Sequence, residues 1–212
     1  MKYVKIFLLV LMTLCVANAF AAKYDSPVKM LREVSTDAID QLKQNKKDLN
    51  SSKQVPLKKI HDIIHKVLLP HVDLDNMARV VLGRNVWQKA TTKQKKHFKM
   101  QFTNLVINTY ASALTTFDKN RIKFFPVRGG YAGKTIVQVN SEVDAPGSPP
   151  LPVVYHLTRK NHGKWLVYDL SVDGISLVQS YKAQFSAIIQ QSNLEGLLKT
   201  LEKHNATLAA TK

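Results

Sequence analysis

The most constraining feature of this chain is an apolar run over residues 165–176 that leads straight into a helical pattern. Its apolar residues occupy both phases of a two-residue alternation, so neither side of such a strand is a clear solvent face. Asp173 and Gly174 break the run. Beyond Ile175 the apolar spacing becomes helical, at positions 177, 178, 181, 185, 188 and 189. The sequence therefore predicts a strand covered on both sides that passes directly into a helix.

Four helices are predicted upstream of this strand. One apolar stripe begins at Pro27, a second stops at Pro70, and a short third helix is capped by Asp73 and ends at Gly83. Thr91 and a glutamine three residues later form a capping box for a long fourth helix. Its apolar stripe comprises Phe98, Phe102, Leu105, Val106, Tyr110, Ala113, Leu114 and Phe117.

From residue 121 the apolar period changes to two, which predicts strands near residues 121–127, 134–143, 152–159 and 164–171. Short links between them favour antiparallel pairing. Helical patterns return over residues 175–191 and 194–204. This order predicts an α+β fold: an antiparallel, roughly four-stranded curved sheet with helices packed on one face, in a single domain.

The first twenty-one residues have the pattern of a secretory signal peptide. Lys2 and Lys5 precede an apolar run of eleven residues, 6–16, and alternate alanines up to residue 21 suit a cleavage site. A membrane anchor needs about 20 apolar residues, so this run is too short to remain as one. Cys15 lies inside the run, so the expected mature chain, residues 22–212, contains no cysteine. We predict a periplasmic domain that relies on its core rather than on disulfides.

The chain is strongly basic, with 31 Lys and Arg against 15 Asp and Glu, a formal net charge of +16. Loss of Lys2 and Lys5 with the signal peptide leaves 29 against 15, a net charge of +14. Such lysines either solvate exposed faces or dock the chain to acidic proteins or anionic headgroups. Nucleic acid is not the expected partner, because no aromatic strand with interleaved arginine occurs.

Several short motifs in this order are typical of one family. They include residues 68–73, residues 81–83 with Trp87, Thr109 with Tyr110, and residues 194–197. Together with the run at 165–176, they make the chain resemble the MlaC (toluene-tolerance) family of periplasmic phospholipid-carrier proteins. The resemblance spans nearly the whole mature chain.

This resemblance implies a nuclear-transport-factor-two-like arrangement around an elongated apolar cavity. It also implies a soluble periplasmic carrier that encloses acyl chains and shuttles phospholipid between the outer and inner membranes to maintain outer-membrane lipid asymmetry. The implied partners are an outer-membrane lipoprotein–porin complex and an inner-membrane transporter complex of the ATP-binding-cassette type. No cofactor is implied, since the phospholipid is cargo.

Alternation places Val137 and Val139 on one face of a strand, and Val153 and Tyr155 on one face of the next. On periodicity alone these residues form ordinary core. The resemblance instead implies that part of this face lines an acyl-chain slot. The predicted lipid-binding residues are Tyr110, Leu151, Ile175, Val153, Tyr155, Val137, Val139, Phe102, Val106 and Met77.

Two arrangements bear on catalysis. His61 and His65 have the i, i+4 spacing of zinc hydrolases, but the acidic residue between them is aspartate rather than glutamate and no third ligand follows. Tyr155, Tyr168 and Asp169 would support acid–base chemistry if they converged. The alternative is that Asp169 bonds the backbone where strand meets turn. We predict no catalytic residue and no metal.

A further alternative is a protein-interaction module whose apolar groove accepts a peptide or a partner helix without transporting lipid. The last helical segment carries leucines that pack either on the body of the protein or on such a partner. Packing on the body is expected, because an exposed leucine stripe favours aggregation. These leucines are Leu194, Leu197, Leu198 and Leu201.

Overall fold

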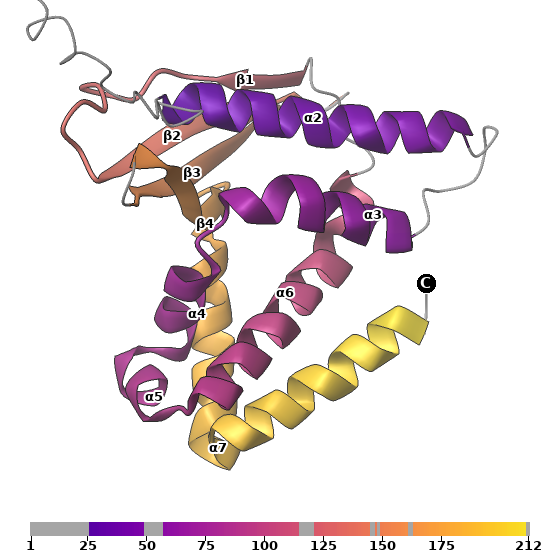
Figure 1. Cartoon of the computed structure of the whole chain (residues 1–212), viewed down its shortest axis with the longest axis vertical. Helices are drawn as coiled ribbons and strands as arrows, with labels where there is room; N and C mark the ends of the chain where they lie inside the picture. The colour runs from indigo at the N-terminus through magenta and orange to yellow at the C-terminus, as the bar shows by residue number, and fades with distance from the viewer. Residues whose placement is uncertain are drawn as a thin grey trace, which may run out of the picture.

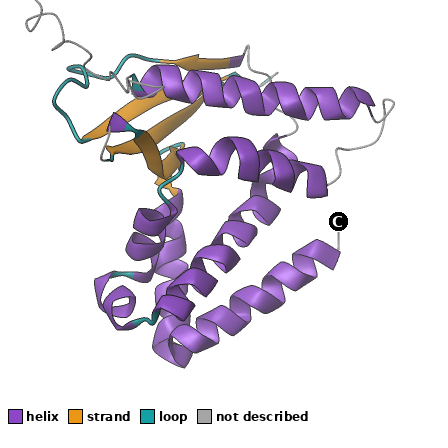
Figure 2. Ribbon diagram, viewed as in Figure 1, coloured by secondary structure: helices purple, strands orange, loops and turns teal. Residues whose placement is uncertain are grey.

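The computed structural model describes residues 26–48, 57–114, 121–144, 147, 149–160 and 163–210, so the expected signal peptide lies outside the described residues. Figure 1 shows a sheet with the first long helix laid across it, above a lobe made of helices. Figure 2 shows that the strands are confined to the upper part of the molecule. Within the described ranges, each helix is too short or too polar to span a bilayer.

The helices of the upper layer are α2 (Pro27–Asp48) and α3 (Leu57–Ile63). Helix α2 begins where predicted, with Pro27 in its first turn and the Ser26 hydroxyl accepting the N–H of Lys29 at 3.3 Å. Helix α3 continues into a π-helical turn, Ile64–Leu68, and then a 3-10 turn, Leu69–His71. The predicted stop at Pro70 is only approximate, since the α-helix ends at Ile63 and the helical turns run on to His71; the π-helical turn was not predicted.

The helices of the lower lobe begin with α4 (Leu74–Leu82), α5 (Arg84–Lys89) and α6 (Thr92–Leu114). The predicted caps are confirmed. The carboxylate of Asp73 accepts the N–H of Asn76 at 3.2 Å, and the Thr91 hydroxyl accepts the N–H of Gln94 at 3.2 Å while the Gln94 side chain accepts the N–H of Thr91 at 3.0 Å. The short α5 was not predicted, because six polar-rich residues carry little periodicity.

The sheet has five antiparallel strands in the order β1-β2-β3-β4-β5. They are β1 (Ile122–Phe124), β2 (Ile136–Val143), β3 (Leu151–Arg159), β4 (Trp165–Val172) and β5 (Ile175–Ser176). The α+β class with an antiparallel sheet is confirmed, and the strand number is five rather than about four. Ile175 was expected to begin a helix and instead lies in β5. Asp173 (φ 49°) and Gly174 (φ 77°) turn the chain back as a two-residue hairpin.

A bulge in β4 explains why its apolar residues occupy both alternation phases. Leu157 pairs with Val167 but Tyr155 pairs with Leu170, so one extra residue of β4 lies between the pairs. The inner-face residues of β4 therefore change from odd to even numbers. Val167 packs on the core beneath the sheet, and Tyr168 packs on the core of the helical lobe. The predicted coverage of both sides of this strand follows from its contact with both cores.

The inner face of the sheet is covered by α2, α3 and the π-helical turn. These elements form a first cluster, the sheet core, in which Val139, Leu157 and Trp165 are fully buried against residues such as Met30 and Ile60. The chain then crosses to the lower lobe along β4, where the N–H of Asp73 donates to the carbonyl of Val167 at 2.8 Å. A second cluster, the helical core, joins α4, α6 and α7 (Leu177–Ala210).

Helix α7 is bent at Asn193, whose backbone is not helical (φ 58°, ψ −173°). The Asn193 side chain accepts the N–H groups of Glu195 and Gly196 at 2.8 and 3.3 Å, so it starts a second helical segment. The sequence predicted two helices that end and restart at this point. We call residues 194–210 the C-terminal arm.

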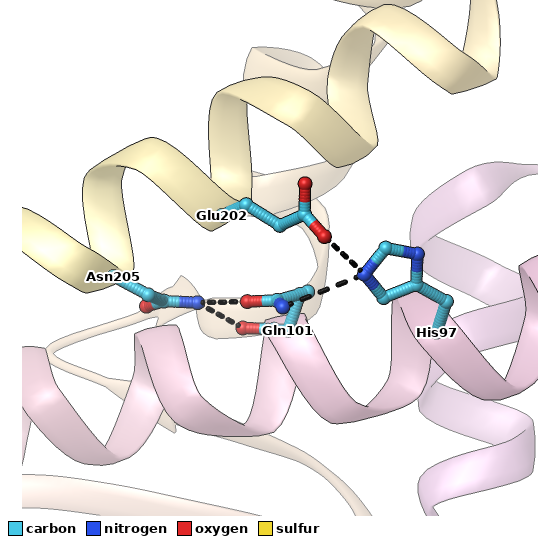
Figure 3. A network of polar contacts seen from close by, with 4 residues as sticks. All are labelled: His97, Gln101, Glu202 and Asn205. Atoms are coloured by element: carbon cyan, nitrogen blue, oxygen red, sulfur yellow. Dashed lines mark hydrogen bonds and ion pairs between the residues drawn. The ribbon is translucent and has the colours of Figure 1, made fainter.

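The C-terminal arm packs back on α6 (Figure 3). His97 Nε2 lies 2.8 Å from Glu202 Oε1, and the Asn205 amide donates to the Gln101 side chain at 2.7 Å and to the Gln101 carbonyl at 2.9 Å. The prediction that the arm packs on its own body is confirmed by its buried leucines, Leu197, Leu198 and Leu201.

Candidate functional site

The predicted site residues of the sheet lie together on its inner face. Val137 pairs with Leu157, Val139 with Tyr155, and Ser141 with Val153, so their side chains alternate along one face of β2 and β3. Val137, Val139 and Val153 are buried. The face is thus apolar over its whole length and interrupted only by Ser141.

The face divides into two parts according to what covers it. Val137 and Val139 belong to the sheet core beneath α2 and α3. Val153 and its neighbour Val143 are also buried, yet neither belongs to the two clusters of described residues. This second part, which we call the sheet end, lies where β2 finishes and β3 begins. Val143 has the same alternation phase as Val137 and Val139 but is not among the predicted lipid-binding residues.

Helix α6 separates the two cores. Its Phe98, Phe102 and Leu105 pack in the helical core, whereas Ile107 packs in the sheet core. Asn108 is buried and its side-chain oxygen lies 2.8 Å from His61 Nε2, which joins α6 to α3. The C-terminal half of α6 therefore runs along the boundary between the cores.

Tyr155 carries the one phenolic hydroxyl on this inner face of β3. Burial raises the pKa of Tyr155, and a smaller opposing effect comes from its hydrogen bond with Ser141. The Ser141 hydroxyl also donates to the carbonyl of Val153 at 3.3 Å. The Tyr155 ring lies 5.7 Å from the ring of Phe124, centroid to centroid. These polar atoms satisfy one another, so the face offers hydrocarbon contacts rather than open hydrogen-bonding groups.

Exposed apolar residues lie at the sheet end. Val172 pairs with Ile175 across the hairpin turn, and the side chains are 36% and 67% exposed. Leu151, the first residue of β3, is half-buried. It lies in the same region, because Val153, two residues later, pairs with Val172. Val172 was missed from the sequence, because its position beside a turn resembles an ordinary strand end.

Tyr110 lies near the end of α6 and is 45% exposed. It is hydrogen-bonded to Tyr181 of α7, as is Thr109. Burial, together with the nearby Tyr110, raises the pKa of Tyr181 to about 12. Tyr110 therefore stands beside the first turns of α7, which follow Ile175 directly in the chain.

The other three predicted residues lie in the helical core or against it. The Phe102 ring contacts the rings of Tyr181 and Phe185 with centroids 5.2 and 6.0 Å apart. Met77 belongs to the same cluster and Val106 packs against it. The structure thus brings Val137, Val139, Val153 and Tyr155 together on one surface and places Phe102, Val106 and Met77 across α6 from them.

Two recesses open on the surface of the described residues. One, of about 560 Å³, lies between α2 and β1 and is lined by residues that include Arg32, Lys123 and Phe124. The other, of about 270 Å³, lies beside the loop before β2, and Val137 is the predicted site residue in its lining. Both are open surface features. The first borders the sheet end, because its lining residue Ile122 pairs with Val143 and Asp144 follows Val143 in the chain.

The residues considered for catalysis have structural partners. Tyr155 lies on the inner face of β3, whereas Asp169 pairs with His156 and so lies on the outer face. They do not converge. No group of three potential metal-ligating side chains occurs within the described part of the chain. His61 and His65 stack with ring centroids 6.4 Å apart, on the helix that contacts α6.

Comparison with known proteins agrees with this architecture. The family model described as MlaC protein matches residues 32–203. The toluene tolerance protein ttg2D of Pseudomonas putida is 25% identical over 187 residues, which cover 88% of this chain and 83% of that protein. The intermembrane phospholipid transport system binding protein MlaC of Haemophilus influenzae is 24% identical over 181 residues, covering 84% of this chain and 81% of its own.

A solved structure shares the fold. The phospholipid-binding protein of Ralstonia solanacearum, determined in complex with a phospholipid, superposes with a TM-score of 0.74 at 28% identity, over 85% of this chain and 97% of that one. The family model covers most of the chain and both curated relatives match over more than four-fifths of its length. On this basis the chain belongs to the MlaC family.

Proposed function

We propose that this chain is a soluble phospholipid carrier that encloses acyl chains and moves lipid between the outer and inner membranes. The observation that carries the proposal is the likeness, at 28% identity and a TM-score of 0.74, to a protein solved with a phospholipid bound. The apolar sheet end supports it, because Val143 and Val153 are buried outside both cores of described residues.

The proposed acyl-chain slot runs along the inner face of the sheet and against α6. Val153 and Tyr155, continued by Val137 and Val139, form its sheet wall. Val106, with Phe102 and Met77 behind it, forms the helical wall. The mouth lies at the sheet end, marked by Leu151, Ile175 and Tyr110, where apolar side chains are exposed.

The energetics require enclosure of both tails. Each acyl CH₂ hidden from water contributes about 0.8 kcal/mol, so two chains with about 30 carbons in total would cost about 24 kcal/mol to carry uncovered through water. Against a bilayer the same slot gains little, since both interiors are apolar. The ionised headgroup remains at the mouth in water, because burying an unpaired phosphate is prohibitive.

Transfer between two such interiors is close to balanced, so its direction must come from docking partners. We propose that the chain is exported by its signal peptide to the periplasm, where an outer-membrane lipoprotein–porin complex and an inner-membrane ATP-binding-cassette transporter complex exchange lipid with it. Such a shuttle maintains outer-membrane lipid asymmetry. The net charge of the chain, +16 before removal of the signal peptide, suits partners with acidic docking surfaces.

The carrier acts without catalysis in this proposal. Asp169, the buried carboxylate nearest to the proposed mouth in sequence, accepts three hydrogen bonds, from the N–H of Val178 in the first turn of α7, the hydroxyl of Ser176 just before it and the N–H of Leu170. Its oxygens are therefore committed to structure. An interaction module without lipid remains the outcome to be distinguished by experiment.

Mass spectrometry of an organic extract tests the proposal directly. The mature chain is purified from a membrane-containing cell extract without detergent, and its lipid is extracted and quantified against protein. Stoichiometric phospholipid is expected. A folded protein that carries none, and takes up none from phospholipid vesicles, would contradict the carrier function and favour the interaction module.

A further inference from the structure

Strand β1 is an edge strand whose outer hydrogen-bonding groups have no partner among the described residues. Phe125 donates its N–H to Asn140 at 2.9 Å, and Asp144 donates to the carbonyl of Arg121 at 2.8 Å. In an antiparallel pair, residues whose backbone groups bond the partner strand alternate with residues whose backbone groups point outward. The backbone N–H and C=O of Lys123 therefore also point toward β2. The N–H and C=O groups of Ile122 and Phe124 consequently point away from the sheet, which leaves two donors and two acceptors along a free edge.

This free edge opens into the larger surface recess rather than into featureless solvent. The recess has a volume of about 560 Å³ and lies between β1 and α2. Figure 1 shows β1 as the outermost strand, running alongside α2. Three residues of α2 with i, i+3 and i+4 spacing line it, namely Arg32, Ser35 and Thr36. The other lining residues are Ile122, Lys123, Phe124 and Asp144.

The charged residues of the recess determine whether it favours an anionic or a cationic ligand. Arg32 and Lys123 are both exposed, and the Lys123 ammonium lies 4.9 Å from the centre of the Phe125 ring. Asp144 supplies the single carboxylate of the lining. The hydroxyls of Ser35 and Thr36 add hydrogen-bonding groups that accept or donate. The local excess is therefore positive, in agreement with the basic character of the whole chain.

We propose that the free edge of β1 docks an extended acidic segment of a partner protein, which adds as a further strand of the sheet. Its backbone pairs with Ile122 and Phe124, and its acidic side chains reach Arg32 and Lys123. Strand addition of this kind takes its affinity from main-chain hydrogen bonds and its specificity from the side chains beside the edge. The site adjoins the proposed lipid slot, since Phe124 contacts Tyr155 of the sheet wall, but the outer hydrogen-bonding groups of the edge strand point away from the sheet and thus from the slot.

Two other occupants fit less well. If a second copy of the chain paired through the same strand, the two-fold relation would bring both copies of Arg32 and Lys123 to one seam, where like charges repel. A bilayer surface satisfies the charge but offers no ordered row of backbone groups for Ile122 and Phe124. The acidic strand is the ligand that satisfies both the edge and the recess.

The test uses the full mature chain and an acetylated, amidated peptide of sequence Thr-Val-Glu-Glu-Val-Thr. Its adjacent glutamates point to opposite faces of a strand, toward Arg32 on the α2 side and Lys123 on the outer side. Binding is followed by two-dimensional NMR of the isotope-labelled chain at low salt. The amide signals of Ile122 and Phe124 should shift and become protected from hydrogen exchange, whereas Lys123 is already paired. A peptide of the same sequence with N-methylated backbone amides should not bind.

Two substitutions with a matched control identify the edge. Ile122→Pro removes a donor that faces outward while leaving the β1–β2 ladder intact, a position that suits proline. It should weaken binding about three- to tenfold, the equivalent of one lost backbone hydrogen bond. Arg32→Glu should weaken binding about tenfold. Arg79→Glu, on α4 and exposed, makes the same change in net charge and should have no such effect.

The outcomes separate the alternatives. Absence of peptide binding at millimolar concentration, or equal loss in Arg32→Glu and Arg79→Glu, overturns the proposal. So does a dimer that dissociates in Ile122→Pro, or anionic vesicle binding that depends on Arg32 without peptide binding. Should Ile122→Pro fail to fold, Arg32→Glu against Arg79→Glu decides the matter. Co-purifying lipid should be unchanged in Arg32→Glu, so failure of this proposal is distinguishable from failure of the carrier function.

Discussion

The carboxylate of Asp169 on β4 accepts the backbone N–H of Val178 in the first turn of α7 at 3.0 Å. It also accepts the Ser176 hydroxyl at 2.6 Å and the N–H of Leu170 at 2.8 Å. A negative charge at a helix N-terminus is stabilised by the helix dipole. One buried anion thus fixes the angle at which α7 leaves the sheet, and α7 carries much of the helical core.

Removal of this carboxylate should destabilise the fold. We expect Asp169→Ala to lower the free energy of unfolding by about 2–4 kcal/mol, because it leaves buried N–H groups unpaired. Urea denaturation measures the loss. As a control, Asp75→Ala removes a carboxylate that is 72% exposed in its ion pair with Lys99, and should cost no more than about 1 kcal/mol. Equal losses in both variants would show that Asp169 is not a structural anchor.

The mouth of the proposed slot is tested by a charge at its exposed end. Ile175→Arg should abolish co-purifying phospholipid with little change in stability, because the side chain is 67% exposed. Ile136→Arg is the matched control: Ile136 is 60% exposed, at the other end of β2 and on the outer face. Lipid quantification and far-ultraviolet circular dichroism are the measurements.

The lipid content of Ile175→Arg and of Ile136→Arg locates the mouth. Loss of lipid in Ile175→Arg alone supports a mouth at the sheet end. Leu151→Arg, at the start of β3, should behave like Ile175→Arg. Retained lipid in both would remove those residues from the site, and loss in Ile136→Arg would point to the outer face instead.

The sheet end should tolerate added volume if it borders a hollow. We expect Val153→Trp to fold and to exclude lipid, since the indole would occupy the slot. The same change at Val81, which is 1% exposed within the helical core, should cost about 1–3 kcal/mol or more through overpacking. Thermal unfolding and lipid content are measured together. Unfolding of Val153→Trp to the same extent as Val81→Trp would indicate a solid interior at Val153.

Alkaline pH should destabilise the fold through Tyr181. Its pKa in the folded state is raised to about 12 from the ordinary value of 10.0, so the folded state holds the phenolic proton more tightly than the unfolded chain. Its contribution is complete below pH 10 and is lost as pH rises through about 12. Tyr181→Phe should therefore reduce the fall in unfolding free energy between these pH values. An identical slope in the variant would assign the effect to other groups.

Gly196 should be intolerant of a methyl group. A Cβ at this position would lie 2.3 Å from Ser192 Oγ and 2.5 Å from Ser192 Cβ, just across the bend at Asn193. Gly to Ala inside a helix ordinarily stabilises by about 0.4–1 kcal/mol. Here Gly196→Ala should instead destabilise by about 1–3 kcal/mol.

The effect of Gly196→Ala on the free energy of unfolding should change sign when the side chain of Ser192 is removed. In a Ser192→Gly background, Gly196→Ala should become neutral or stabilising, because the clashing atoms are absent. Urea denaturation of the four proteins in this cycle gives the coupling. Additive effects would mean that the backbone at the bend relaxes freely.

Much of the local structure followed from short-range chemistry. The caps at Asp73 and Thr91 depend on residues that contact their own near neighbours, so their signals are complete within a few positions. The π-helical turn after Ile63 was missed, because it packs against distant parts of the chain in the sheet core. The two-residue β5 and its hairpin turn were missed, because so short a strand carries no periodicity.

The candidate site was predictable only in part. Alternation in β2 and β3 placed Val137, Val139 and Val153 on one face, but periodicity does not tell a packed core from a slot. That Val153 lies outside the sheet core depends on which part of the sheet α2 and α3 cover, and this is a tertiary contact. The exposure of Val172 depends on the hairpin that projects it.

By itself the sequence determined the order of the longer helices and strands, the caps at Asp73 and Thr91, and the apolar faces that must be buried, because each of these rests on residue spacing along a chain of fixed geometry. Tertiary structure alone decided that β4 shifts phase at a bulge, that α6 divides the interior into two cores, and that no described residue pairs with the outer edge of β1 beside Arg32. These features arise from contacts between segments far apart in sequence, whose meeting no local pattern encodes.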